Sequence, residues 1–168
     1  MHPHARLPLL LAALTMASCA PRTEDPLIRA AKAALPVSGA SYTGTPRVLS
    51  LNIDAPVGTV EVQSPRLNAG LDQLAAGLMK DGQASSGNAP SGSVKCGRYE
   101  HLTWATADGE AQFRDRISAA GWKRTILSAE GVAEQGVLQK NSVTVLYAET
   151  RADTGRWLGL CTLTRTGG

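Results

Sequence analysis

The chain has 168 residues, of which 43% are hydrophobic and only 4% are aromatic. That length suits one compact domain or two very small ones, and the core has to be built mainly from Leu, Val, Ile and Ala. The formal net charge of +3 is small, and no run of Lys or Arg forms the basic stripe that nucleic acid requires. We therefore expect no nucleic-acid partner and no purely electrostatic one.

Residues 1–18 have the three-part pattern of an export signal. A start that carries Arg6 and no acidic residue precedes an apolar run over residues 7–14, and small residues follow before Cys19. The apolar run is much shorter than the roughly 20 residues needed to cross a bilayer. We therefore expect a signal peptide rather than a permanent transmembrane helix.

The residues that end this signal are Met16, Ala17, Ser18 and Cys19. They resemble the lipobox of bacterial lipoproteins, although the family usually has Leu where this chain has Met16. The resemblance covers only the signal. It implies that the Cys19 thiol receives a diacylglycerol and that a dedicated peptidase cuts after Ser18. The alternative is ordinary signal-peptide cleavage nearby, which would release a soluble secreted protein.

Lipid on Cys19 would tether the protein to a membrane in the cell envelope. Each buried methylene adds about 0.8 kcal/mol, so two or three acyl chains hold a protein stably. Residue 20 is Ala rather than the Asp that resembles an inner-membrane retention signal, so an outer-membrane or outer-surface location follows by analogy. Residues 19–25 then form a short tether.

Two cysteines remain besides Cys19, namely Cys96 and Cys161. An even pair in an oxidising compartment favours one structural disulfide. Two separate buried thiols are an alternative. A redox-active pair is a weaker one, because the two cysteines do not form a Cys-x-x-Cys motif.

Residues 26–80 are predicted to form an N-terminal α/β region. Asp25 and Pro26 have the cap and the proline of a helix start, which predicts a helix over residues 26–34. Alternating apolar residues then predict a strand over residues 48–53, and a second strand over residues 57–63 would complete a hairpin. Ser64 and Pro65 repeat the helix start, and a stripe of leucines follows at helical spacing: Leu67, Leu71, Leu74 and Leu78.

Residues 81–93 are rich in Gly and Ser and are predicted to be a linker or a long loop. Residues 94–168 then predict a C-terminal domain with a strand over 94–106, a helix over 109–120 capped by Asp108, and strands over 122–128, 134–140, 143–150 and 156–164. Short turns make these last strands an antiparallel meander. The predicted class is α+β, a two-layer sandwich in which the helix covers one sheet face.

No residue pattern in the chain points to catalysis, a cofactor or a metal site. His101 is the only histidine after the signal, and an exposed or half-buried strand histidine explains it better than a catalytic base. A histidine with scattered carboxylates also lacks the paired spacing of a metal site. Three carboxylates near one helix start, Asp108, Glu110 and Asp115, are explained by the helix dipole.

The tryptophans are the remaining candidates for a site. Trp104, Trp122 and Trp157 could line a sugar or peptide site on the open sheet face, although core packing is the simpler explanation. The leading hypothesis is therefore a non-enzymatic envelope lipoprotein that acts as a binding or assembly module for another envelope protein. The alternative is a lipoprotein that holds a small apolar or glycan ligand on its open sheet face.

Overall fold

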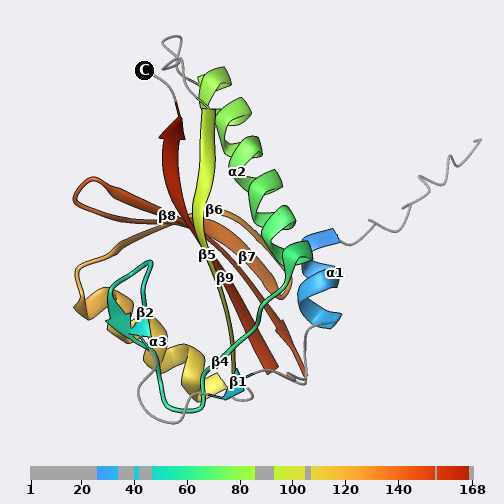
Figure 1. Cartoon of the computed structure of the whole chain (residues 1–168), viewed down its shortest axis with the longest axis vertical. Coiled ribbons are helices and arrows are strands. Elements are labelled where there is room, and N and C mark those ends of the chain that lie inside the picture. Colours follow the sequence, from blue (N-terminus) through green and yellow to red (C-terminus); the bar gives the residue numbers. More distant parts are fainter. Residues whose placement is uncertain are drawn as a thin grey trace, which may run out of the picture.

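The computed structural model describes residues 26–33, 40–41, 47–85, 93–104, 107–153 and 155–166. Cys19, the predicted signal peptide and the tether lie outside these residues. The fold combines helices with an antiparallel sheet, as the sequence predicts (Figure 1).

The main sheet has seven strands in the order β1-β4-β5-β9-β8-β7-β6, and every pairing in it is antiparallel. Its strands are β1 (Ala40–Ser41), β4 (Val60–Glu61), β5 (Ser93–Trp104), β6 (Lys123–Glu130), β7 (Ala133–Lys140), β8 (Val143–Ala152) and β9 (Gly155–Thr166). A separate two-stranded hairpin consists of β2 (Arg47–Val48) and β3 (Ile53–Asp54).

The predicted meander is confirmed, since β6, β7, β8 and β9 follow one another in the sheet and are joined by tight turns. Gly131 and Asn141 lie in two of these turns with φ values of 59° and 53°, a left-handed conformation that Gly and Asn adopt at low cost. Strand β5 pairs with β9 along most of its length. The first strand of this unit therefore lies beside its last.

The predicted disulfide is also confirmed. Cys96 on β5 and Cys161 on β9 are bonded, with their Cα atoms 5.4 Å apart. The bond links two neighbouring strands that are 65 residues apart in the chain, so it closes the unit that runs from β5 to β9.

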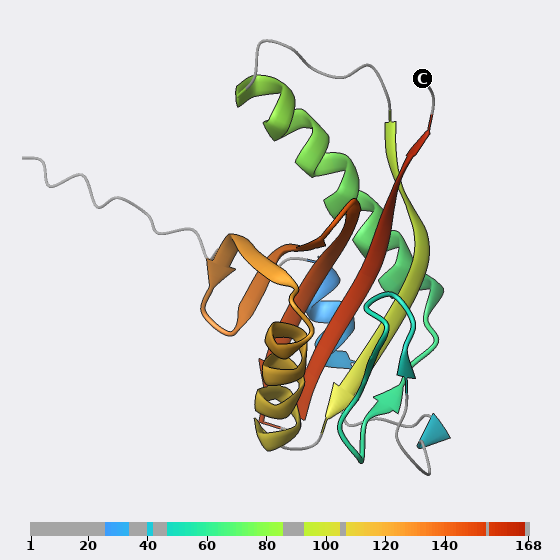
Figure 2. The ribbon, with the colours of Figure 1, turned by 90° about the vertical axis from the view of Figure 1, so that its left-hand side faces the viewer.

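Both faces of the sheet are covered by helices, which differs from the predicted two layers with one open face. Helices α1 (Pro26–Ala33) and α2 (Pro65–Ser85) lie on one face, and α3 (Ala107–Ala119) lies on the other together with the β2–β3 hairpin (Figure 2). Leu67 and Leu71 of α2 pack with Trp157 of β9 in the first of two buried clusters. Phe113 and Ile117 of α3 belong to the second cluster.

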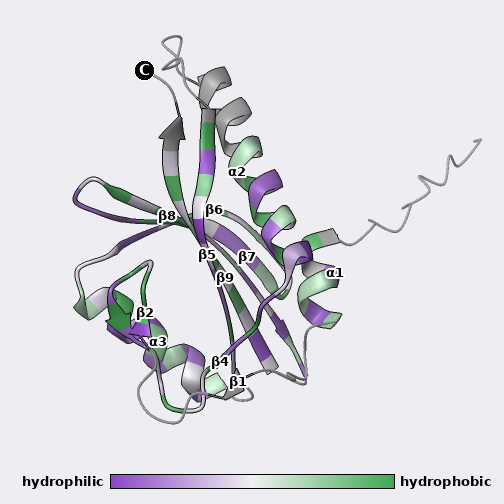
Figure 3. Ribbon diagram, in the orientation of Figure 1, coloured by the Kyte–Doolittle hydropathy of each residue, from purple (hydrophilic) through white to green (hydrophobic). Residues whose placement is uncertain are grey.

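The hydropathy pattern explains why both faces are covered (Figure 3). Four consecutive residues of β8, Val145 to Ala148, are buried, and alternate ones belong to the two clusters. A strand that is apolar on both sides needs a layer on each face. The N-terminal region therefore packs directly on the C-terminal sheet.

Two predicted elements differ in detail. The hairpin expected over residues 48–53 and 57–63 does not form, because β2 pairs with β3 inside the first segment and β4 joins the main sheet beside β5. Helix α2 begins as predicted, with the hydroxyl of Ser64 accepting a hydrogen bond from the amide of Leu67 at 3.4 Å. It continues to Ser85, so the start of the predicted linker is helical.

Candidate functional site

The three tryptophans singled out in the sequence do not share a surface. Trp104 and Trp122 belong to the cluster beneath α3, and Trp157 belongs to the cluster beneath α1 and α2. All three are buried. The indole of Trp104 donates to Thr59 Oγ1 at 2.8 Å, and that of Trp122 donates to the carbonyl of Leu51 at 3.1 Å. These contacts anchor Trp104 and Trp122 in the core.

His101 is fully buried, in contrast to the exposed or half-buried position predicted for it. It lies on β5 facing α2, with Nε2 2.7 Å from Asn68 Oδ1 and its ring stacked on Trp157 at 5.8 Å between centroids. Burial lowers the pKa of His101 to about 4. The neutral ring therefore serves as a packed polar link between β5 and α2.

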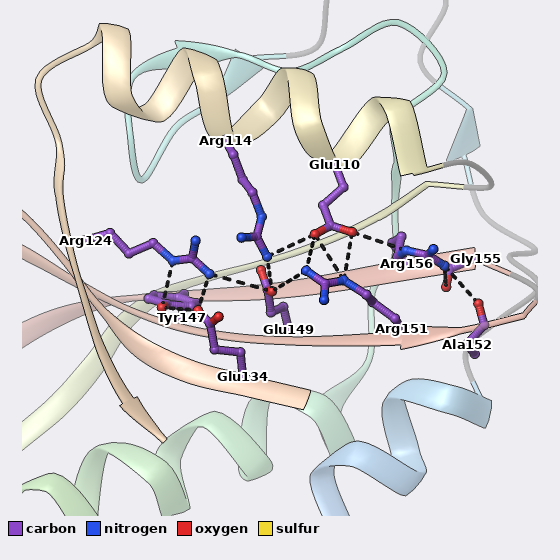
Figure 4. Close-up of polar contacts among 10 residues, drawn as sticks. All are labelled: Glu110, Arg114, Arg124, Glu134, Tyr147, Glu149, Arg151, Ala152, Gly155 and Arg156. Atoms are coloured by element: carbon purple, nitrogen blue, oxygen red, sulfur yellow. Dashed lines mark hydrogen bonds and ion pairs between the residues drawn. The ribbon is translucent and has the colours of Figure 1, made fainter. Parts of the chain in front are cut away.

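A row of charged side chains lies between α3 and the sheet (Figure 4). We call it the charged row; its members are Glu110, Arg114, Arg124, Glu134, Glu149, Arg151 and Arg156. They come from α3 and from all four strands of the meander. The site is therefore assembled only when the helix packs on the sheet.

Glu110 organises one end of this row. Its carboxylate accepts hydrogen bonds from Nη2 and Nε of Arg151, the shortest at 2.6 Å, and forms ion pairs with Arg114 at 2.9 Å and Arg156 at 3.2 Å. Burial alone would raise the pKa of Glu110, but these three arginines lower it overall. Glu110 is thus a fixed anion that neutralises several cations.

Tyr147 and Glu149 on β8 form the other end. The hydroxyl of Tyr147 donates to Glu134 at 2.5 Å and accepts a hydrogen bond from Nε of Arg124 at 2.9 Å. Arg124 is also paired with Glu134, and Arg114 is paired with Glu149. Burial raises the pKa of Glu149, against the opposing effect of the nearby Arg114.

A pocket of about 250 Å³ opens at this end of the charged row. We call it the α3 pocket. Its polar wall consists of Arg114, Arg124, Tyr147 and Glu149 and its apolar wall of Ile117, Trp122, Leu138 and Leu158, with Ser118 exposed at the rim. Of the predicted ligand-face residues, Trp122 alone lines this pocket. An apolar wall with a few convergent polar groups is the usual composition of a small-molecule site.

The signals for this site in the sequence are weak. The helix dipole explains an acidic residue at the start of α3, but the side chain of Glu110 lies between α3 and the sheet and bonds to Arg151 of β8. The alternation of Tyr147, Glu149 and Arg151 places these three side chains on one face of β8. That pattern indicates that one end of the buried strand carries polar side chains. It does not show which residues of α3, β6 and β7 contact these side chains.

Among the described residues, no group of three or more His, Cys, Asp or Glu is arranged to hold a metal ion. None of the helices in the described ranges is long and apolar enough to cross a membrane. Comparisons with family models, with curated proteins and with solved structures found no match for this chain.

Proposed function

We propose that this protein is a bacterial envelope lipoprotein, anchored by lipid on Cys19, whose folded domain is a non-enzymatic module that binds a small ligand in the α3 pocket. The observation that carries the binding role is the pocket itself, with guanidinium groups on one wall and buried apolar side chains on the other. The expected site shifts from an open sheet face to the space beneath α3, because helices cover both faces.

The anchor is supported by the resemblance of Met16, Ala17, Ser18 and Cys19 to a lipobox. We expect the N-terminal peptide of the purified protein to begin at residue 19 and to carry the mass of its acyl chains. The Cys19→Ser variant should lose that mass and leave the membrane fraction. An unmodified Cys19 in the wild-type protein, or an intact precursor in the cytoplasm, would contradict the anchor.

The binding role is tested on the full chain in lipid nanodiscs, with a library of small neutral, anionic and cationic fragments. We expect some fragments to raise the melting temperature by a few degrees, because a ligand that binds only the folded state stabilises it. Ser118→Trp should abolish these shifts, since the indole would fill the rim of the α3 pocket. Shifts that survive this substitution would place the ligand elsewhere.

An assembly role in the envelope is the second candidate, and strand β6 favours it. This strand ends the described sheet, and all its residues except Arg124 are exposed, including the apolar Ile126 and Leu127. An exposed strand edge can accept an extended segment of a partner protein. A photo-crosslinker at Leu127 should then capture one envelope protein in living cells, and a crosslinker at the exposed Val57 should not.

A further inference from the structure

We propose that the α3 pocket selects a small monocarboxylate with an apolar body, such as an arylalkanoic or short acyl acid. This inference rests on the proposed binding role and adds the chemical class of the ligand. The carboxylate would lie between Arg114 and Arg124, and the apolar body would lie against Trp122, Leu138 and Leu158.

The net charge of the charged row favours one anionic group. The charged row has four guanidinium groups and three carboxylates, so it carries one net positive charge, and three of its arginines share Glu110. Arg114, Arg124 and Glu149 of this row line the pocket, whereas Glu134, the partner of Arg124, lies outside the lining. A monoanion would balance the site, whereas a dianion would add repulsion from Glu149 and Glu134.

Hydrogen-bond donors are also available where the anion would lie. Arg114 uses only Nη2 in its contacts with Glu110 and Glu149, which leaves Nη1 as a donor for a ligand. Arg124 uses Nε and Nη2, for Tyr147, Glu134 and Glu149. Figure 4 shows Arg124 at one end of the row beside Tyr147 and Arg114 in the middle, with Glu149 contacting both guanidinium groups. Planar guanidinium groups match the two oxygens of a carboxylate.

The rest of the pocket limits what is attached to that carboxylate. Its volume of about 250 Å³ is just below the roughly 300–1,000 Å³ of pockets for drug-sized ligands, so the ligand is small. Trp122, Leu138 and Leu158 are buried and offer the ligand apolar surface. A sugar would leave its hydroxyl groups without partners along this wall. An aromatic or short aliphatic body fits it better.

The test uses three probes of one shape and different charge: 4-phenylbutyrate, 4-phenylbutanol and 4-phenylbutylamine. Each is titrated by calorimetry into the full chain in nanodiscs, with empty nanodiscs as the blank. We expect 4-phenylbutyrate to bind at least tenfold more tightly than the alcohol, and the amine to show no binding. Because this comparison is made on the wild-type protein, it does not depend on any variant folding.

Two variants then locate the anion. Arg124→Gln should weaken the binding of 4-phenylbutyrate at least tenfold, because the substitution removes a guanidinium group that would contact the carboxylate. The affinity for 4-phenylbutanol should stay within about twofold of the wild-type value. Ser118→Trp should weaken both probes. The matched control is Arg66→Gln, since Arg66 is exposed on α2 at the opposite sheet face and should change neither affinity.

The outcomes separate this inference from the binding role on which it rests. Equal binding of the butyrate and the alcohol, or preference for the amine, overturns the carboxylate inference while the pocket remains a ligand site. Tight butyrate binding that is unchanged by both Arg124→Gln and Ser118→Trp places the anion elsewhere and also overturns it. If neither these probes nor any library fragment binds, the proposed binding role fails as well.

Discussion

His101 and Asn68 join the middle of β5 to α2 through one hydrogen bond of 2.7 Å between Nε2 and Oδ1. Because the amide oxygen can only accept, Nε2 must carry the proton. The neutral ring then has no proton on Nδ1, which is buried and has no partner among the described residues. A second proton could be added only at this buried nitrogen, which is why the pKa falls to about 4.

The first prediction is a loss of stability in mild acid that depends on His101. Between pH 6.5, the ordinary pKa, and pH 4 the unfolded chain binds a proton that the folded chain does not. The free energy of unfolding should therefore fall as the pH is lowered through this window, by about 3 kcal/mol in total. Urea unfolding at pH 7.0 and at pH 4.5 measures the effect.

His101→Gln is the control for this prediction, because Gln can donate to Asn68 but does not titrate. The variant should lose less stability than the wild-type protein between the two pH values, since the carboxylates contribute equally to both. Identical pH dependence in the two proteins would show that the pKa of His101 is the same in the folded and the unfolded chain, and would contradict the prediction.

The second prediction concerns the disulfide between Cys96 and Cys161. It closes a long loop between strands that already pair, so it acts mainly by restricting the unfolded chain. The double variant Cys96→Ala/Cys161→Ala should lose about 4 kcal/mol in the free energy of unfolding. Reductant should destabilise the wild-type protein in urea by a similar amount and should leave the double variant unchanged. A response of the double variant to reductant would mean that another thiol is involved.

The third prediction concerns Glu100, a buried carboxylate on β5. Its two oxygens accept hydrogen bonds from the amides of Leu49 and Ser50, both at 2.7 Å, and so hold the β2–β3 hairpin on the sheet. Glu100→Ala should cost about 3 kcal/mol because it leaves two amides without acceptors. Glu100→Gln keeps one acceptor oxygen and should cost less.

Hydrogen exchange gives the local readout for the Glu100 variants. The amides of Leu49 and Ser50 should exchange faster in Glu100→Ala, while amides of the β8 strand should change only with global stability. Unchanged protection at residues 49 and 50 would argue that the turn is held by its other contacts.

The part of the fold from β5 to β9 could be predicted because alternation and turn residues are patterns of neighbouring residues in the chain. Alternation and turn residues placed the meander strands within three residues of their observed bounds. The hairpin at residues 48–53 was missed because the alternation of Leu49, Leu51 and Ile53 suggested one longer strand. In the structure Leu49 is exposed, and Val48 is buried instead. A turn over residues 49–52, in which Asn52 has a φ of 54°, breaks the pattern.

The second layer and the candidate site depend on contacts that no local pattern carries. Leu67 and Leu71 indicate an apolar helix face, but not that Trp157 and Ala148 are its partners. In the charged row, Glu110 and Arg151 are 41 residues apart in the chain. The packing of α3 on the sheet brings such pairs together. Taken alone, each of these charged residues is of a type that is common on the surface of a helix or strand.

The fourth prediction is that Gly159 is required for the stacking of Trp157 on His101. Gly159 lies on β9 opposite His101, and a Cβ there would lie 2.6 Å from the Trp157 ring and 3.3 Å from Nδ1 of His101. Gly159→Ala should therefore displace the indole and cost about 2 kcal/mol, as overpacking of a rigid core does. Urea unfolding measures the loss, and near-ultraviolet circular dichroism should show the changed indole environment.

Gly77→Ala is the matched control, since Gly77 lies within α2 and its Cβ would meet nothing within 4 Å. This substitution should be neutral or stabilise the protein by up to about 1 kcal/mol, because Ala favours the helix. If Gly159→Ala proved as stable as the wild type, the ring of Trp157 would have to move at little cost. The stacked pair would then be a loose contact rather than a fixed part of the core.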